Sequence, residues 1–429
     1  MMSYKHYNAY KESDIHWAME IPQKWNISKL KRIFQFEKGK NSNLLTEEYV
    51  KSNEGPYPVY SGQTKNNGVL GSIDSYEYDF KNNVILVTTV GAKAMTTFLI
   101  NGKLSLSQNC ALIKLKSSDD FSNYYYYLCK ILFNYERGLI PDIMQPSLRI
   151  GDLNTYNIIK PPLEEQQQIA NYLDKQTAKI DATIAKNEEL IQLLEEKRVA
   201  LINQVVTKGL NPDVPMKDSG VEWIGEIPEH WDVEKIKKYF TVHNGSTPKD
   251  TEDNWGGDIC WITPADYKTT DIYINNSSRQ ITKTGVNSCG TTLVPKGSII
   301  VSNRAPIGTV AIANVDLCTN QGCKSLAIKK DINTKFVYYL LSINEKELNK
   351  LGRGTTFMEL SAYDLGAFLI PIAPLTEQKD IVTYLDKETS KINQTVSKIK
   401  ENIILLEEYK TSLIHHVVTG KIDVRGEEI

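Results

Sequence analysis

The residues that could do chemistry in this sequence do not form a catalytic pattern. The chain lacks the Asn-Pro-Pro-aromatic and Asp-Pro-Pro-Tyr tetrads of amino-methyl transfer and the Gly-x-x-x-x-Gly-Lys-Ser/Thr loop of nucleotide hydrolysis. Neither Pro141-Asp142 nor Pro212-Asp213 is followed by the acid-x-Lys pattern of nucleases. We therefore expect a binding protein and not an enzyme.

Cysteine and histidine spacing predicts no metal or cofactor site. The six cysteines show neither Cys-x-x-Cys pairing nor a histidine at metal-ligand spacing. We expect them to be reduced thiols in the core, and His415-His416 to lie on the surface.

The element that must position the rest is a long helix predicted over Leu163–Lys208. Pro161-Pro162 precedes it and Gly209 follows it, as is typical of the two ends of a helix. At ~1.5 Å per residue it would extend roughly 70 Å. A helix of that length does not fit inside a small domain, so it should join two domains.

The same helix occurs a second time at Leu375–Gly420, offset by 212 residues (Pro162 to Pro374). Tyr-Leu-Asp-Lys begins at both Tyr172 and Tyr384. Two helices with matching apolar stripes should pack on each other. In heptad spacing their predicted pairing residues are Leu173, Ile180, Asn187, Leu194, Leu201, Leu385, Ile392, Ile399, Leu406 and Leu413.

Two details qualify this pairing. Asn187 is polar where the second helix has Ile399, and it could set the register. Leu190, Leu193 and Ile202 widen the apolar stripe, which indicates more than one neighbour.

The segments before the two helices also repeat one another. Glu-Ile-Pro-x-x-Trp occurs at 20–25 and again at 226–231, where the aromatic residues are more typical of core anchors than of ligand cages. Strands are expected at 83–89, 110–115, 298–301 and 309–312, a hairpin at Asn101-Gly102, and helices over 124–133 and from Lys335.

The predicted fold class is α/β (α+β). It is a pseudo-two-fold tandem repeat with two domains joined by two long antiparallel helices that form a coiled coil. The expected boundaries are domains at 1–160 and 211–372, helices at 161–210 and 373–421, and a tail at 422–429.

Charge gives only weak information about the partner. The formal net charge is −2. Residues 1–162 carry 19 Lys/Arg and 15 Asp/Glu, a net of +4, whereas residues 209–374 carry 17 and 19, a net of −2. If the chain binds DNA, a partner should therefore supply part of the positive charge. The sequence has no apolar run of 18 residues and no signal-peptide pattern, which predicts a cytoplasmic protein.

Several short motifs together carry a resemblance to a known family. They are the doubled Pro-Leu-x-Glu-Gln at 162–166 and 374–378, the doubled Glu-Ile-Pro-x-x-Trp, Gly245–Pro248, Trp255–Ile259, Thr263–Asp266, Ala305–Gly308 and Thr319–Gly322, with the variants Tyr57–Gly62 and Ser107–Asn109. The layout resembles the specificity subunit of type I restriction-modification systems from about Asp14 to Asp423.

This resemblance implies a non-catalytic subunit without a cofactor. In it, two target-recognition domains each read one half of a split double-stranded DNA sequence. The helices hold the domains apart and dock two modification (methyltransferase) subunits, and restriction subunits can be present. No membrane association is implied.

No family motif identifies the base contacts, so the candidates come from side-chain chemistry on loops. In the first domain they are Ser61, Gln63, Thr64, Lys65, Asn66, Lys93 and Arg137; in the second, Ser246, Thr247, Lys249, Lys268, Arg304, Arg353, Thr355 and Thr356.

Two alternatives remain open. The chain could be the DNA-reading part of a fused restriction-methylation enzyme, or a coiled-coil scaffold protein. The missing catalytic motifs argue against the first, and two units of about 150 residues with polar, Gly-rich loops argue against the second.

Overall fold

The computed structural model describes residues 4–141, 143–266, 272–304, 306–353 and 358–426. The chain forms two compact units, of which unit 1 is residues 1–188 with 400–429 and unit 2 is residues 189–399. Each unit thus contains one mixed α/β part and one half of each long helix, α5 (Leu163–Lys208) and α10 (Leu375–Val418).

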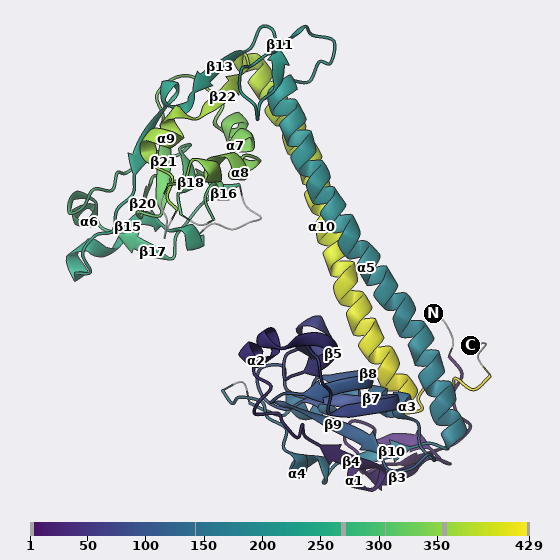
Figure 1. Cartoon of the computed structure of the whole chain (residues 1–429). Helices are drawn as coiled ribbons and strands as arrows, with labels where there is room; N and C mark the ends of the chain where they lie inside the picture. The colour runs from purple at the N-terminus through teal and green to yellow at the C-terminus, as the bar shows by residue number, and fades with distance from the viewer. Residues whose placement is uncertain (1–3, 142, 267–271, 305, 354–357, 427–429) are drawn as a thin grey trace. The chain divides into compact units, whose positions relative to one another are not determined.

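Unit 1 is built on a six-stranded sheet in the order β4-β9-β7-β8-β5-β6 (Figure 1). Its strands are β4 (Phe34–Glu37), β5 (Glu54–Tyr60), β6 (Val69–Ile73), β7 (Tyr78–Thr88), β8 (Thr97–Leu106) and β9 (Cys110–Leu115). Strand pairs β1 (Tyr10–Glu12) with β2 (Glu20–Pro22), and β3 (Asn26–Lys29) with β10 (Asn157–Lys160), flank this sheet. Its helices are α1 (Leu30–Ile33), α2 (Glu47–Ser52), α3 (Ser122–Gly138), α4 (Ile150–Leu153) and the 3₁₀ turn η1 (Lys65–Gly68).

Unit 2 divides the same layout between two sheets. The five-stranded sheet is β14 (Phe240–Asn244), β21 (Cys323–Ile328), β18 (Ile299–Ser302), β19 (Val310–Ala313) and β16 (Tyr273–Ile274); the three-stranded sheet is β17 (Arg279–Ile281), β15 (Trp255–Ile262) and β20 (Leu317–Thr319). Strand pairs β11 (Met216–Asp218) with β12 (Glu226–Pro228), and β13 (Asp232–Lys235) with β22 (Leu369–Ile372), repeat the flanking pairs of unit 1. The helices are α6 (Lys283–Asn287), α7 (Thr334–Ser342), α8 (Glu345–Lys350) and α9 (Ala362–Ala367), with 3₁₀ turns η2 (Ile236–Lys238), η3 (Glu252–Asn254) and η4 (Pro264–Asp266).

The repeated tryptophans are core anchors, as predicted. Trp25 and Trp231 are both fully buried. The indole Nε1 of Trp25 donates to Glu165 at 2.8 Å, and that of Trp231 donates to Glu377 at 3.0 Å. Each glutamate lies in the first turn of a long helix, so each tryptophan fixes the start of its helix against the sheet layer.

The long helices pack together, which confirms the predicted pairing. In unit 1, Leu173 of α5 shares one hydrophobic core with Leu413 and Val417 of α10. In unit 2, Ile202 of α5 shares a core with Leu385 of α10. The first half of one helix therefore lies beside the second half of the other, which makes the pair antiparallel.

The predicted pairing residues differ in depth. Leu173, Ile180, Leu385, Ile392 and Leu413 are buried, whereas Asn187, Leu194, Leu201, Ile399 and Leu406 are half-buried. Within the described chain the amide nitrogen of Asn187 has no hydrogen-bond partner, so the structure gives no contact through which it would set the register.

One expectation about a turn was wrong. Asn101-Gly102 is not a hairpin turn but lies inside β8, where Gly102 (φ +77°) faces an irregularity between Phe80 and Val84 of β7. Asn-Gly also suits a β-bulge because the bulge needs a residue with positive φ. Leu190 and Leu193 are 43% and 54% exposed, whereas Ile202 is buried in the core of unit 2, so a further neighbour of the stripe stays a prediction.

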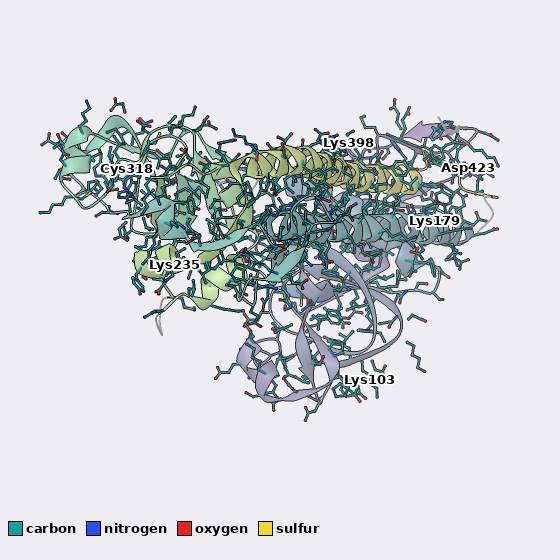
Figure 2. All side chains as sticks on the ribbon, turned by 90° about the horizontal axis from the view of Figure 1, so that it is seen from above. Lys103, Lys179, Lys235, Cys318, Lys398 and Asp423 are labelled. Carbon is teal, nitrogen blue, oxygen red and sulfur yellow. The ribbon has the colours of Figure 1, made fainter. Side chains whose placement is uncertain are left out.

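The segment after α10 packs on the start of the chain within unit 1. The backbone N–H of Asp423 donates to the carbonyl of Lys5 at 2.8 Å, and Tyr10 donates to the carbonyl of Gly420 at 3.0 Å. The guanidinium of Arg425 lies 4.5 Å from the ring centroid of Tyr7. Figure 2 shows Asp423 just beyond the end of α10.

Burial predicts which leucines between the two long helices stabilise the protein most. Leu173→Ala and Leu385→Ala each remove a side chain with no exposed area, and each should lower the free energy of unfolding by about 2–5 kcal/mol. Leu194 and Leu406 are half-buried, so Leu194→Ala and Leu406→Ala should lower the free energy of unfolding by less. Denaturant unfolding of the four variants measures these losses.

Leu173 and Leu385 belong to different units, so the costs of their truncations should add within about 0.5 kcal/mol. Equal losses for the buried and the half-buried pairs would contradict this packing.

Candidate nucleic-acid interface

Unit 1 brings several polar loops together beside its sheet. The N–H of Leu148 donates to the carbonyl of Thr89 at 2.7 Å, and the N–H of Thr89 donates to Asn109 at 2.7 Å. The N–H of Gly62 donates to the carbonyl of Gln108 at 3.2 Å. We name the loops joined in this way loop cluster 1: residues 38–43, 61–66, 89–95, 107–109 and 146–149.

A groove of about 500 Å³ runs through loop cluster 1. Its lining is mostly hydrogen-bonding, with Lys38, Ser42, Asn43, Thr89, Ser107, Gln108, Asn109, Ser147 and Arg149 beside Val90, Cys110, Leu148 and Ile150. In the described chain neither Lys38 nor Arg149 has a carboxylate within ion-pair distance, and both are exposed. These two cations are available to an anionic ligand.

The one thiol of the groove is not a nucleophile at neutral pH. Burial, with a smaller contribution from Glu77, raises the pKa of Cys110 to about 12. The thiol therefore stays protonated and packs as a small apolar group.

The residues predicted from sequence in unit 1 lie around this groove but do not line it. Ser61 is buried, Gln63 and Thr64 are half-buried, and Lys65 and Asn66 are exposed. The side chain of Gln63 is used within its own loop, where it donates to the carbonyl of Val69.

Lys93 and Arg137 are connected through the loop of residues 89–95. Lys93 is exposed, and Arg137, at the end of α3, donates to the carbonyl of Ala92. Arg137 therefore braces the loop that carries Lys93.

Sequence analysis missed Lys38, Asn43 and Arg149. These residues come together only because the loops after β4 and before α4 meet at residues 107–109. Two signals were available in the sequence. One is Ser107–Asn109, which was used only as a family motif, and the other is Ser147–Leu153, which has its counterpart at Glu359–Leu365.

Unit 2 builds the same backbone arrangement a second time. The backbone N–H of Leu360 donates to the carbonyl of Asn303 at 3.0 Å, and the backbone N–H of Asn303 donates to the carbonyl of Gly322 at 3.0 Å. These bonds correspond to those of Leu148 and Thr89 in unit 1. We name this set loop cluster 2: the described residues of 245–249, 263–266, 303–308, 319–322 and 353–361.

The first candidates in unit 2 serve their own loops in part. Ser246 is half-buried, and its carbonyl accepts from the indole of Trp261 at 3.0 Å. Thr247 is exposed and donates to the side chain of Gln321. The carbonyl of Lys249 accepts from Asn254 at 2.9 Å, while its side chain is exposed. Lys268, Thr355 and Thr356 lie outside the described residues.

Both candidate arginines of unit 2 have acidic partners. The guanidinium of Arg304 lies 3.3 Å from a carboxylate oxygen of Glu359, and that of Arg353 lies 3.0 Å from a carboxylate oxygen of Asp364. The side chain of Arg353 is 79% exposed, whereas that of its partner Asp364 is only 10% exposed. Loop cluster 2 therefore holds its arginines against carboxylates, unlike loop cluster 1.

The described residues contain no group of three or more His, Cys, Asp or Glu side chains placed to hold a metal ion. Among the same residues, no helix is long and apolar enough to cross a membrane. All six cysteines are reduced thiols, and five of them are buried. What both clusters offer is a dense set of hydrogen-bond donors and acceptors with a few cations.

The same polar loop arrangement occurs twice, once in each α/β unit, and each unit also contains half of each long helix. This layout is that of a subunit with two binding sites of one kind. The family of type I restriction modification DNA specificity domains matches residues 22–192 and 228–404. The chain belongs to this family and is the DNA specificity subunit of a type I restriction-modification system, the non-catalytic part of that complex.

Individual relatives agree with this assignment. The putative type I restriction enzyme MjaX specificity subunit of Methanocaldococcus jannaschii is 27% identical over 433 residues, or 95% of each chain. The MjaIX specificity subunit of the same organism is 40% identical over 186 residues, and the chain matches 42% of its length.

Solved structures show the same fold. A chain from a study of assembly and conformational transition in a type I restriction-modification system has a TM-score of 0.69 at 17% identity, covering 93% of this chain and 98% of that one. The HsdS subunit of Thermoanaerobacter tengcongensis has a TM-score of 0.50 at 17% identity, covering 94% and 98%.

Proposed function

We propose that loop clusters 1 and 2 each read one half of a bipartite, asymmetric DNA target. In this proposal residues 1–160 and 211–372 are the two target-recognition domains, and residues 161–210 and 373–421 are the helices between them. The observation that carries it is that one backbone arrangement occurs twice with different side chains. Val90 and Ser147 stand in cluster 1 where Arg304 and Glu359 stand in cluster 2.

Different side chains on the same backbone predict different half-sites. Amide and hydroxyl groups such as those of Asn43, Gln108 and Ser147 can pair with base edges. Exposed cations such as Lys38 and Arg149 can bind phosphates and fix the register. Because the formal net charge is −2, few phosphates are neutralised by this chain alone.

The rest of the positive surface should come from partners. We propose two modification (methyltransferase) subunits, with restriction subunits as possible further members, in the cytoplasm. Leu193 in unit 2 and Leu405 in unit 1 support docking on the helices. They are equivalent by the 212-residue offset and are 54% and 62% exposed. Equivalent apolar residues suit two copies of the same partner.

The arginines of unit 2 provide the first test. Arg304→Ala or Arg353→Ala should relax or abolish recognition of one half of the target and leave the other half intact. One good base contact contributes ~1–3 kcal/mol of discrimination. The measurement is to sequence the methylated sites in cells that express each variant with the methyltransferase.

Loss of recognition of both halves at once, with the protein still folded, would argue against two independent readers. Unchanged sites in both variants would remove these arginines from the interface.

A further inference from the structure

Glu359 is the only carboxylate among the described residues of loop cluster 2 that contacts two cations. One of its oxygens lies 3.3 Å from the guanidinium of Arg304 and the other 3.4 Å from the ammonium of Lys324. It also accepts a hydrogen bond from the side-chain amide of Asn303 at 2.9 Å. Its backbone forms bridges with both Arg304 and Arg353. Glu359 thus lies at the centre of loop cluster 2.

Burial separates the roles of these contacts. Asn303 is fully buried and Lys324 is 6% exposed, whereas the side chains of Arg304 and Glu359 are 50% and 40% exposed. The pair formed with Lys324 neutralises a nearly buried charge, and the pair formed with Arg304 faces solvent. A ligand that approaches the cluster would therefore meet Arg304 and Glu359 first. Two cations and one carboxylate leave a net charge of +1.

Unit 1 shows that the fold does not need this carboxylate. Its equivalent backbone bridge joins Val90 to Ser147, neither of which is charged. The equivalent of Lys324, by the offset between Cys110 and Cys323, is Ala111. Among the described residues of unit 1 the same loops close without an ion pair, so the backbone arrangement itself does not require the charged group.

The chemistry of the pair fits base recognition better than phosphate binding. An unpaired arginine next to DNA binds any phosphate, which adds affinity without sequence selection. A carboxylate beside it repels phosphates and holds the guanidinium in one orientation. The same carboxylate can accept a hydrogen bond from the exocyclic amine of a base, as arginine can donate to guanine.

We propose that Glu359 is a specificity-determining residue of the second half-site. It positions Arg304 for a base edge and prevents Arg304 from acting as a sequence-independent phosphate anchor. This inference rests on the proposed function, because it assumes that loop cluster 2 faces one half of the target.

The test uses the complete chain in complex with its methyltransferase subunits. Four DNA duplexes are compared. One carries the intact target sequence identified by methylation mapping, one has the first half-site replaced, one has the second half-site replaced, and one has both replaced. Binding is measured over a range of salt concentrations for the wild-type protein, Glu359→Gln, Glu359→Asp and a matched control, Glu234→Gln. Glu234 forms an ion pair with Lys238 in unit 2, outside loop cluster 2, so the control removes the same charge.

Glu359→Gln should lower the penalty for replacing the second half-site on the order of tenfold and leave the first-half penalty unchanged. Binding to the duplex without half-sites should depend more steeply on salt, with a slope increased by about 0.9, because Arg304 becomes one further phosphate contact. Glu359→Asp keeps the charge, so the slope should stay at the wild-type value while discrimination falls. Glu234→Gln should change neither quantity.

Glu359→Gln leaves Lys324 buried without its counter-ion, which could unfold unit 2. The double variant Lys324→Met/Glu359→Gln removes both charges and should show the same loss of second-half discrimination. If the wild-type complex loses affinity when a half-site is replaced but the Glu359 variants behave like Glu234→Gln, Glu359 does not determine specificity. If the wild-type complex shows no half-site penalty, the proposed function itself fails.

Discussion

Residues 1–210, expressed with the methyltransferase subunit, should assemble as a symmetric dimer and direct methylation to an inverted repeat of the first half-site. The fragment contains one recognition domain and all of α5 but lacks α10. A closed pair of identical units is two-fold symmetric, so the asymmetric target should become symmetric. The gap between half-sites should stay near that of the intact protein, because the same helix length sets it at ~3.4 Å per base pair.

The packing of unit 1 explains why a second copy can replace α10. Four buried residues near the end of α10 complete the core of unit 1, and α5 carries the same four residue types at the offset of 212. In α10 they are Leu413, Ile414, Val417 and Val418; in α5 they are Leu201, Ile202, Val205 and Val206. The α5 helix of a partner copy can therefore enter the same apolar site in the same orientation.

Two features set the strength of this dimer. Asn187 would meet the surroundings of another α5 and not those of Ile399, which should weaken the pair. Ile422 and Val424, buried in unit 1 beyond α10, are equivalent by the same offset to Leu210 and Pro212. A companion fragment ending at Pro215 should therefore dimerise more tightly than residues 1–210.

The control for the dimer is Ile202→Asp in the fragment, which places a charge in the core site and should leave a monomer. Size measurement of the complex and sequencing of methylated sites decide the outcome. A soluble monomer of the unmodified fragment, or methylation of the original asymmetric target, would contradict the two-fold arrangement.

Removing the two free cations of the unit 1 groove should strongly weaken binding of the first half-site without changing which bases are preferred there. Lys38→Gln/Arg149→Gln takes two exposed positive charges from loop cluster 1 and keeps hydrogen-bonding side chains in their place. If both bind phosphates, the slope of log affinity against log salt should fall by about 1.8, and affinity at low salt should drop strongly. Recognition of the second half-site should persist.

Lys103→Gln is the matched control within unit 1. Lys103 is exposed on β8 and lies 4.7 Å from the ring centroid of Tyr76, outside the groove. Lys103→Gln should leave the binding of both half-sites and the salt slope nearly unchanged. If Lys103→Gln and Lys38→Gln/Arg149→Gln had equal effects, the whole surface of unit 1, and not the groove, would supply the charge.

The sequence predicted the helices well because their signals are local. Pro162 and Gly209 border α5 where the structure begins and ends it, and the repeated Tyr-Leu-Asp-Lys placed α10. The signal failed where the same residues serve two structures. Asn101-Gly102 suits a turn as well as a bulge, and only the pairing of β8 with β7 decides between them.

The site was predicted less well because tertiary contacts create it. Lys38 and Arg149 are distant in sequence and have no local pattern that marks them as neighbours. Arg304 was predicted from its residue type, but its partner Glu359 depends on how two loops meet. The candidates in residues 61–66 lie in a loop that contacts the groove through Gly62 and Gln108, and which of them contact bases stays a prediction.

The most direct measurement is to map methylated sites across a host genome that carries this chain and its methyltransferase partner. We expect one target with two unlike half-sites at a constant separation, methylated only when this chain is present. A single continuous site, a palindrome read by the intact chain, or methylation that does not depend on this chain would contradict it.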